Sequence, residues 1–161
     1  MRHAIEAVLA TIIVPGAAVI LGPYLILVAQ DPVPAPRRDL AGVLAILLIA
    51  LGTFMVVWVA YAFVTHGRGT PIPIDPPRNF VRAGLFRFVR NPMYLGALLV
   101  LIGETILFQR LWVGAYALGV WLLLHTFLIV FEEPQLRRRF GQAYLDYCAV
   151  TPRWIPRPPS R

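Results

Sequence analysis

Two short segments hold the side chains that could do chemistry. One is Arg90–Gly96, which reads Arg-Asn-Pro-Met-Tyr-Leu-Gly, and the other is the adjacent pair Glu132 and Glu133. Asn is a preferred N-cap residue and Pro is favoured at the first helical position, so the Asn-Pro pair predicts the start of a helix. The unpaired N–H groups of Met93 and Tyr94 then carry positive partial charge beside the arginine. Together with the glutamates, they predict a site for a ligand of mixed charge.

The two glutamates are predicted at the end of a helix, where the negative end of the helix dipole disfavours carboxylates by roughly 0.3–1 kcal/mol. Compensation could come from the arginines at 137–139 on a solvated face, or from a bound cation or ribose hydroxyls. His125 precedes Glu132 by seven residues, close to two helical turns, so both side chains are expected on similar faces. The Asn-Pro segment also has a plain alternative, a well-capped membrane helix with an interfacial tyrosine. Within it, Gly96 leaves room for a ligand or a neighbouring helix.

The composition indicates an integral membrane protein, because 58% of the residues are apolar and only 14% are charged. Four apolar stretches approach the roughly 20 residues that a helix needs to cross a bilayer. We expect an all-α membrane protein with about four transmembrane helices, at Glu6–Gln30, Leu40–His66, Pro92–Gln109 and Leu111–Phe131. The first stretch lacks the features of a secretory signal and is expected to stay in the mature protein. The four spans form one predicted membrane-embedded domain, residues 1–161.

The arginines indicate how the chain crosses the membrane. With four spans, twelve arginines lie on the side of the two termini and the second loop, whereas Arg37, Arg38 and Arg110 lie on the other. Arginines beside spans are retained in the cytoplasm, so both termini are predicted in the cytosol. The site, formed by the loop before the third span and the end of the fourth, would face soluble metabolites. The same asymmetry accounts for the net charge of +7 without nucleic acid.

Other chemistries have little support in the sequence. The single cysteine, Cys148, excludes disulfides and cysteine-cluster metal sites and reads as a structural thiol near the interface. The three histidines are too scattered to predict a metal centre from their spacing. The run at 67–77 contains four prolines and is predicted to be an extended loop, because proline interrupts helices.

At these residues the chain resembles the isoprenylcysteine carboxyl methyltransferase and phospholipid methyltransferase superfamily of small integral-membrane enzymes. Arg90–Gly96 resembles its Arg-His/Asn-Pro-x-Tyr-x-Gly motif, and Glu132-Glu133-Pro134 resembles its acidic motif. The segments 140–147 and 151–156 resemble the tail of many bacterial members, which implies a bacterial cytoplasmic membrane. The match covers about half the chain, residues 78–156.

The resemblance implies methyl transfer from S-adenosylmethionine to a lipophilic acceptor held between helices. The residues implied to bind the cofactor are Arg78, Asn79, Phe80, Val81, Phe86, Asn91, Pro92, Met93, Tyr94, Gly96, Glu132 and Glu133. Charge agrees with this set, because the sulfonium and ammonium of the cofactor favour glutamates and its carboxylate favours a helix N-terminus or arginines. Arg90 would steady a phosphate or carboxylate head group. His125 or Glu132 would accept the proton that an amine acceptor must lose.

The acceptor stays open between several classes. Eukaryotic carboxyl methyltransferases of this family carry arginine four positions before the acidic pair, where this chain has Leu128, and Asn91 replaces their usual histidine. The first expectation is still methyl transfer of the carboxyl O-methylation type. The alternatives are N-methylation of a phospholipid or another amine, and a non-catalytic module whose arginines bind anionic lipid or a partner. The enzyme is favoured, because a non-catalytic module does not explain the glutamates at a helix end.

We predict that tags at Met1 and Arg161 both lie in the cytosol, together with a cysteine engineered near Thr70, because the arginine asymmetry sets the orientation. Labelling of each position in sealed cells with an impermeant thiol or protease probe measures this. Reaction at any of the three only from outside would contradict the charge argument.

Overall fold

The structure, a computed structural model, describes residues 16–158 except 31, 33 and 63–82. The regular elements of the described part are all helices, and it contains no strand, which confirms the all-α class. Its elements are a helix at Gly16–Val28, α2 (Leu40–Ala62), the 3₁₀ helix η2 (Gly84–Arg87), α3 (Pro92–Phe108), α4 (Leu111–Phe127), the π-helical turn η3 (Leu128–Glu132), α5 (Glu133–Phe140) and α6 (Gln142–Val150). The proline-rich run and the predicted site residues Arg78, Asn79, Phe80 and Val81 lie outside the described residues.

Two helices are long and apolar enough to cross a membrane by length and composition, α2 and the continuous helix Leu111–Phe140, with mean hydropathies of 2.7 and 2.0. Gly16–Val28 and α3 are shorter apolar helices. Large apolar side chains cover the outside of these helices, and examples such as Leu40, Leu111 and Trp112 are more than two-thirds exposed. Soluble monomers rarely expose such continuous apolar surface, so this surface suits the lipid of a membrane.

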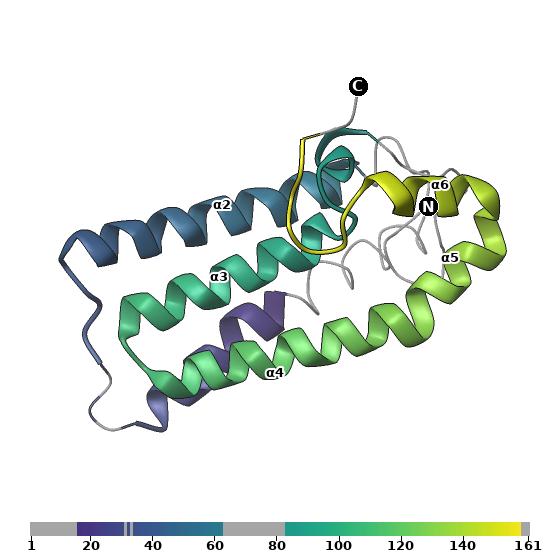
Figure 1. The fold of residues 1–161 in the computed structure, drawn as a ribbon. Helices are drawn as coiled ribbons and strands as arrows, with labels where there is room; N and C mark the ends of the chain where they lie inside the picture. Colours follow the sequence, from purple (N-terminus) through teal and green to yellow (C-terminus); the bar gives the residue numbers. More distant parts are fainter. Residues whose placement is uncertain (1–15, 31, 33, 63–82, 159–161) are drawn as a thin grey trace, which may run out of the picture.

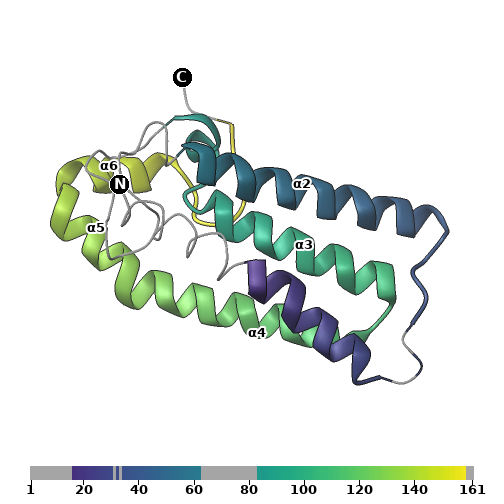
Figure 2. The ribbon, with the colours of Figure 1, turned by 180° about the vertical axis from the view of Figure 1, so that it is seen from behind.

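Helices α2 and α3 pack side by side along most of their length (Figures 1 and 2). Small residues make this close approach possible, because Gly96 on α3 lies directly against the backbone of Gly52 on α2. A Cβ atom at Gly96 would lie 2.7 Å from the Gly52 carbonyl oxygen and 3.0 Å from Cβ of Met55. Glycines at a helix interface allow backbones to approach in this way where lipid supplies no hydrophobic drive. Gly96 therefore makes room for a helix, the second of its two predicted uses.

The helix Gly16–Val28 packs against α4 and is seen in front of it in Figure 2. The hydroxyl group of Tyr116 donates a 2.9 Å hydrogen bond to the carbonyl oxygen of Ala18. At the far end of the bundle, the backbone N–H of Arg37 donates to the carbonyl oxygen of Leu107 at the end of α3. The first bond attaches the helix Gly16–Val28 to α4, and the second attaches the segment before α2 to the end of α3.

The fourth apolar helix does not end at the glutamates, so their predicted position at a helix C-terminus is wrong. The helix continues through η3 into α5, and the backbone N–H of Glu133 donates to the carbonyl oxygen of Leu128 across one π-helical turn. Pro134 follows at the start of α5. A proline inside an α-helix clashes with the carbonyl group four residues earlier, and a wider π turn gives that carbonyl group room. The glutamates thus lie inside a helix of 30 residues.

We predict that Gly96→Ala destabilises the protein by about 1–3 kcal/mol, because the added methyl group must push α2 and α3 apart. Gly119→Ala on α4 is the matched control, since nothing lies within 4 Å of its added Cβ and alanine favours a helix over glycine. Thermal unfolding in detergent measures both. Equal stability of the two variants would contradict close packing at Gly96.

Candidate functional site

The functional residues gather at one end of the helical bundle, where α3 begins and α4 continues into α5 (Figure 1). Gly141 ends α5 with φ of 55°, a left-handed value that favours glycine, and the chain turns there into α6. After α6, the tail Thr151–Arg157 folds back across the start of α3. Side chains from three separate parts of the sequence therefore meet at this end.

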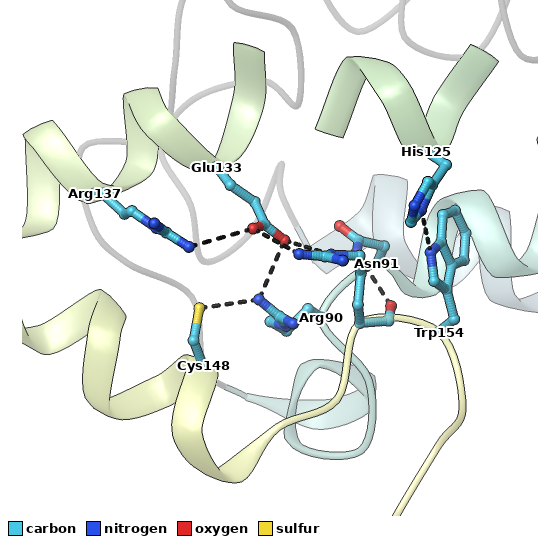
Figure 3. A network of polar contacts seen from close by, with 8 residues as sticks. Arg90, Asn91, His125, Glu133, Arg137, Cys148 and Trp154 are labelled. Carbon is cyan, nitrogen blue, oxygen red and sulfur yellow. Dashed lines mark hydrogen bonds and ion pairs between the residues drawn. The ribbon is translucent and has the colours of Figure 1, made fainter. Parts of the chain in front are cut away.

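Glu133 is the centre of the polar network in Figure 3. It is only 4% exposed, and its carboxylate accepts two hydrogen bonds from Arg153, of 2.7 and 2.9 Å. Arg90 donates a third at 3.1 Å, and the half-exposed Arg137 lies 3.7 Å away. The hydrogen bonds and charge of Glu133 raise the pKa of the Arg153 guanidinium. One buried carboxylate is thus surrounded by three cations from three different segments.

The tail is attached to the start of α3 through backbone groups as well. The N–H of Arg90 donates to the carbonyl oxygen of Pro152 at 2.9 Å, and the N–H of Arg157 donates to that of Phe88 at 3.0 Å. The side chain of Asn91 donates to the carbonyl oxygen of Arg153 at 3.1 Å. Helix α3 begins at Pro92 as predicted, but the Asn91 side chain makes no capping hydrogen bond and instead donates through Nδ2 to the tail.

Helix α6 adds two contacts to the same end. The hydroxyl group of Tyr147 donates a 2.7 Å hydrogen bond to the carbonyl oxygen of Phe86 in η2. The thiol of Cys148 lies 3.1 Å from the Arg90 guanidinium. Cys148, predicted as a structural thiol, and Phe86, predicted beside the cofactor, therefore both lie in this layer of contacts. Arg90, predicted to steady a head group, has partners within the protein.

Glu132 has a different environment from its neighbour. It is half-buried, and its carboxylate accepts a 3.0 Å hydrogen bond from the hydroxyl group of Tyr94 in the first turn of α3. Among the residues that the structure describes, it forms no ion pair. Pro92 and Met93, between Asn91 and Tyr94, are buried. The two adjacent glutamates therefore differ: arginines neutralise one, and a single phenol contacts the other.

His125 lies at the same end but has other partners. Its Nδ1 atom accepts a 3.0 Å hydrogen bond from the indole N–H of Trp154, and its ring stacks on Trp121 with centroids 5.2 Å apart. A π turn at Leu128–Glu132 changes the α-helical spacing between His125 and Glu132, and the two side chains have different partners, Trp154 and Tyr94. Figure 3 shows His125 and Trp154 beside Asn91.

Sequence reasoning missed Arg153 and Trp154 as partners of the site. Both belong to the segment 151–156, for which the sequence offered only a resemblance to the tail of many bacterial members. The available signal was an arginine and a tryptophan in a short proline-bounded stretch after the last helix. Nothing in their spacing indicates that the stretch folds back onto α3, because that depends on the turn at Gly141 and on the direction of α6.

The fold and this site define a helical, membrane-associated protein with a charged site at one end of its bundle. A model of the phospholipid methyltransferase family matches residues 40–143, from the start of α2 into α6. The chain belongs to this family, and the predicted membership of a membrane methyltransferase superfamily is confirmed. No curated protein gives a significant match. The matched range includes Arg90–Gly96 and both glutamates but ends before Arg153 and Trp154.

We predict that Glu133→Gln lowers the free energy of unfolding by about 3–5 kcal/mol, because it removes the only carboxylate between Arg90 and Arg153 among the described residues. Arg137→Gln is the control, since its 3.7 Å pair is half-exposed and worth about 0.3–0.5 kcal/mol. Thermal unfolding in detergent compares the variants. Similar small losses in both would show that the Glu133 network does not hold this end together.

Proposed function

We propose that the protein transfers the methyl group of S-adenosylmethionine to a lipophilic acceptor in the membrane. The family membership supports a membrane methyltransferase. The observation that carries the proposal further is the contrast between the two glutamates. Glu133 is neutralised within the protein, whereas Glu132 has only the Tyr94 hydroxyl group as a partner among the described residues.

An unpaired carboxylate in a partly dry site is costly, so it favours a bound positive charge. S-adenosylmethionine carries two such charges, a sulfonium and an ammonium, and its ribose hydroxyls can donate to a carboxylate. Glu132 and Tyr94 face each other between α3 and the continuous helix Leu111–Phe140, so a ligand bound to Glu132 would contact both helices. We propose that Glu132 holds the positive part of the cofactor and that Glu133 keeps this helix in place.

The start of α3 suits the negative part of the cofactor. The first amide groups of a helix have no acceptor within the helix, and here no side chain caps them. The N–H groups of Met93 and Tyr94 therefore offer donors at the positive end of the helix dipole for a carboxylate. Phe86 is proposed beside the cofactor, together with Arg78, Asn79, Phe80 and Val81, on the family resemblance alone. Gly96 is left out of this proposal, because α2 covers it.

We propose four spans with both termini in the cytosol of a bacterium, so that the site opens on the cytosolic face. The described arginines support this orientation. Arg87, Arg90, Arg137, Arg138, Arg139, Arg153 and Arg157 belong to the segments at the site end, whereas Arg37, Arg38 and Arg110 flank the spans at the other end. The positive-inside rule then places the site end in the cytoplasm.

Between the acceptor classes, an amine fits this site better than a carboxylate. Leu128 is 1% exposed and apolar, where carboxyl methyltransferases of the family have arginine, and the Arg90 guanidinium is bound to Glu133. A carboxylate acceptor would thus lack both of its expected cations. An amine acceptor needs no cation from the chain, and it must lose its proton before its nitrogen lone pair can attack. The family description points to a phospholipid as the carrier of this amine.

The transfer itself demands little beyond alignment. When bound, S-adenosylmethionine supplies a methyl group on a good leaving group, so the amine nitrogen gains the new bond as the carbon–sulfur bond breaks. The protein contributes by holding both reactants in line between α3 and the helix Leu111–Phe140. Such alignment can be worth roughly 7–11 kcal/mol relative to free encounter.

We predict that Glu132→Gln weakens binding of S-adenosylhomocysteine about ten- to a hundredfold with little change in stability, because a charged hydrogen bond to the ammonium group of this ligand is lost. Titration calorimetry in detergent measures the affinity. Glu104→Gln is the control, since Glu104 lies near the other end of α3. Unchanged affinity in Glu132→Gln would exclude the proposed role of Glu132. No binding to the native protein would favour the non-catalytic alternative, a module for anionic lipid or a partner.

A further inference from the structure

An apolar groove of about 320 Å³ lies between α3 and α4. It is lined by Leu98, Ile102, Thr105 and Ile106 from α3 and by Gly114, Ala117, Leu118 and Trp121 from α4. Thr105 is the one hydroxyl-bearing side chain of this lining, and its hydroxyl group already donates a 2.8 Å hydrogen bond to the carbonyl oxygen of Leu101. Apart from the indole N–H of Trp121, the other lining side chains are hydrocarbon, so a hydrocarbon chain fits the groove.

The two helix faces that line the groove continue into the candidate site. Residues four apart lie on one face of a helix, one turn from each other. On α3, the turn before Leu98 carries Tyr94, the partner of Glu132. On α4, the turn after Trp121 carries His125, whose ring stacks on Trp121. His125 and Tyr94 thus flank the end of the groove that leads to the proposed methyl-transfer site.

The hydrogen bond from Trp154 decides what the neutral His125 ring can do. An indole N–H is only a donor, so Nδ1 of His125 must be the acceptor and carry no hydrogen. A neutral imidazole then carries its hydrogen on Nε2 and acts there as a donor. The one lone pair that could accept a proton is occupied by Trp154. His125, predicted as a possible base, is therefore poorly placed for that role.

Trp154 is itself held in place through its neighbour in the tail, Arg153. Arg153 binds Glu133 through two hydrogen bonds, and the carbonyl oxygen of Arg153 accepts one from Asn91. The His125 ring is held between Trp121 and Trp154, whose centroids lie 5.2 and 6.1 Å from its own. The ring thus has a fixed orientation as well as a fixed hydrogen position.

We propose that His125 is a specificity-determining residue, whose Nε2–H donates to a phosphodiester oxygen of a phospholipid acceptor, while one chain of this lipid occupies the α3–α4 groove. Trp154 is the positioning residue that keeps His125 in the donor form. This inference rests on the proposed function and adds how the lipid is recognised. Along the helix Leu111–Phe140, the groove comes first, then His125 and then Glu132. A phospholipid presents its hydrocarbon chain, its phosphate and its amine in the same order.

The hydrogen position can be measured without activity. In a His3→Gln, His66→Gln background, His125 is the only histidine, and ¹⁵N NMR in nanodiscs shows which ring nitrogen carries hydrogen. We expect the Nε2–H form alone, and a mixture of both forms after Trp154→Phe, which keeps the aromatic ring but removes its N–H. The control Trp112→Phe, at the start of α4 and largely exposed, should change nothing. The Nδ1–H form in the unaltered site, or no change in Trp154→Phe, would overturn the proposal.

The recognition step is tested in nanodiscs with methyl-labelled S-adenosylmethionine and two acceptors. One is phosphatidylethanolamine, and the other is a long-chain primary amine without phosphate. His125→Ala should raise KM for the phospholipid about ten- to a hundredfold and leave KM for the plain amine and the affinity for S-adenosylhomocysteine unchanged. His125→Gln, which keeps a donor near the position of Nε2, should recover most of the loss. Equal changes for both acceptors, or no recovery, would overturn the role of His125. Failure of the native protein to bind S-adenosylhomocysteine would instead refute the proposed function.

Discussion

The buried carboxylate of Glu133 is the interaction on which this end of the molecule depends. It joins three segments: the start of α3 through Arg90, helix α5 through Arg137, and the C-terminal tail through Arg153. Burying a charge is unfavourable unless partners and hydrogen bonds compensate it. Within the described residues, the compensation comes from arginines that are distant in sequence or on the next turn. The contact therefore forms only when all three segments are in place. In the proposed function, the neighbouring Glu132 is then the carboxylate available to a ligand.

This arrangement divides the tasks of the acidic pair. A single acidic residue could not both neutralise buried arginines and attract a cationic ligand, because the first task consumes its charge. With two adjacent glutamates on one helix, the π turn and the helical rotation send them in different directions, one to Arg153 and one to Tyr94. Structural and ligand-facing charges can then lie one residue apart. The same division applies on α3, where Asn91 holds the tail and Tyr94 faces Glu132.

The sequence predicted what depends on local chemistry. The helical class, the helix start at Pro92 and the family membership are confirmed, because apolar runs, the Asn-Pro pair and short motifs are visible in consecutive residues. Four spans, their orientation and the cofactor contacts stay predictions. The wrong expectations were those that assumed an ordinary α-helix or an ordinary cap. The helix expected to end at the glutamates continues through a π turn before Pro134, and the Asn91 side chain binds the tail instead of capping α3. The first effect depends on Pro134, a local residue, whereas the second arises from a tertiary contact that no local pattern contains.

The continuity of the helix Leu111–Phe140 has a consequence for the choice of membrane. At about 1.5 Å per residue, the stretch from Leu111 to Glu132 is roughly 30 Å long. A bilayer's hydrocarbon core is also about 30 Å thick. If Leu111 lies at one interface, as in the proposed topology, Glu132 lies at the level of the opposite head groups. In a thicker bilayer the helix would sit more upright, or Glu132 would sink below the amines, and in a thinner one it would tilt or stand above them. Membrane thickness would then influence which lipid amines reach the site, in addition to any contact that the protein makes with them.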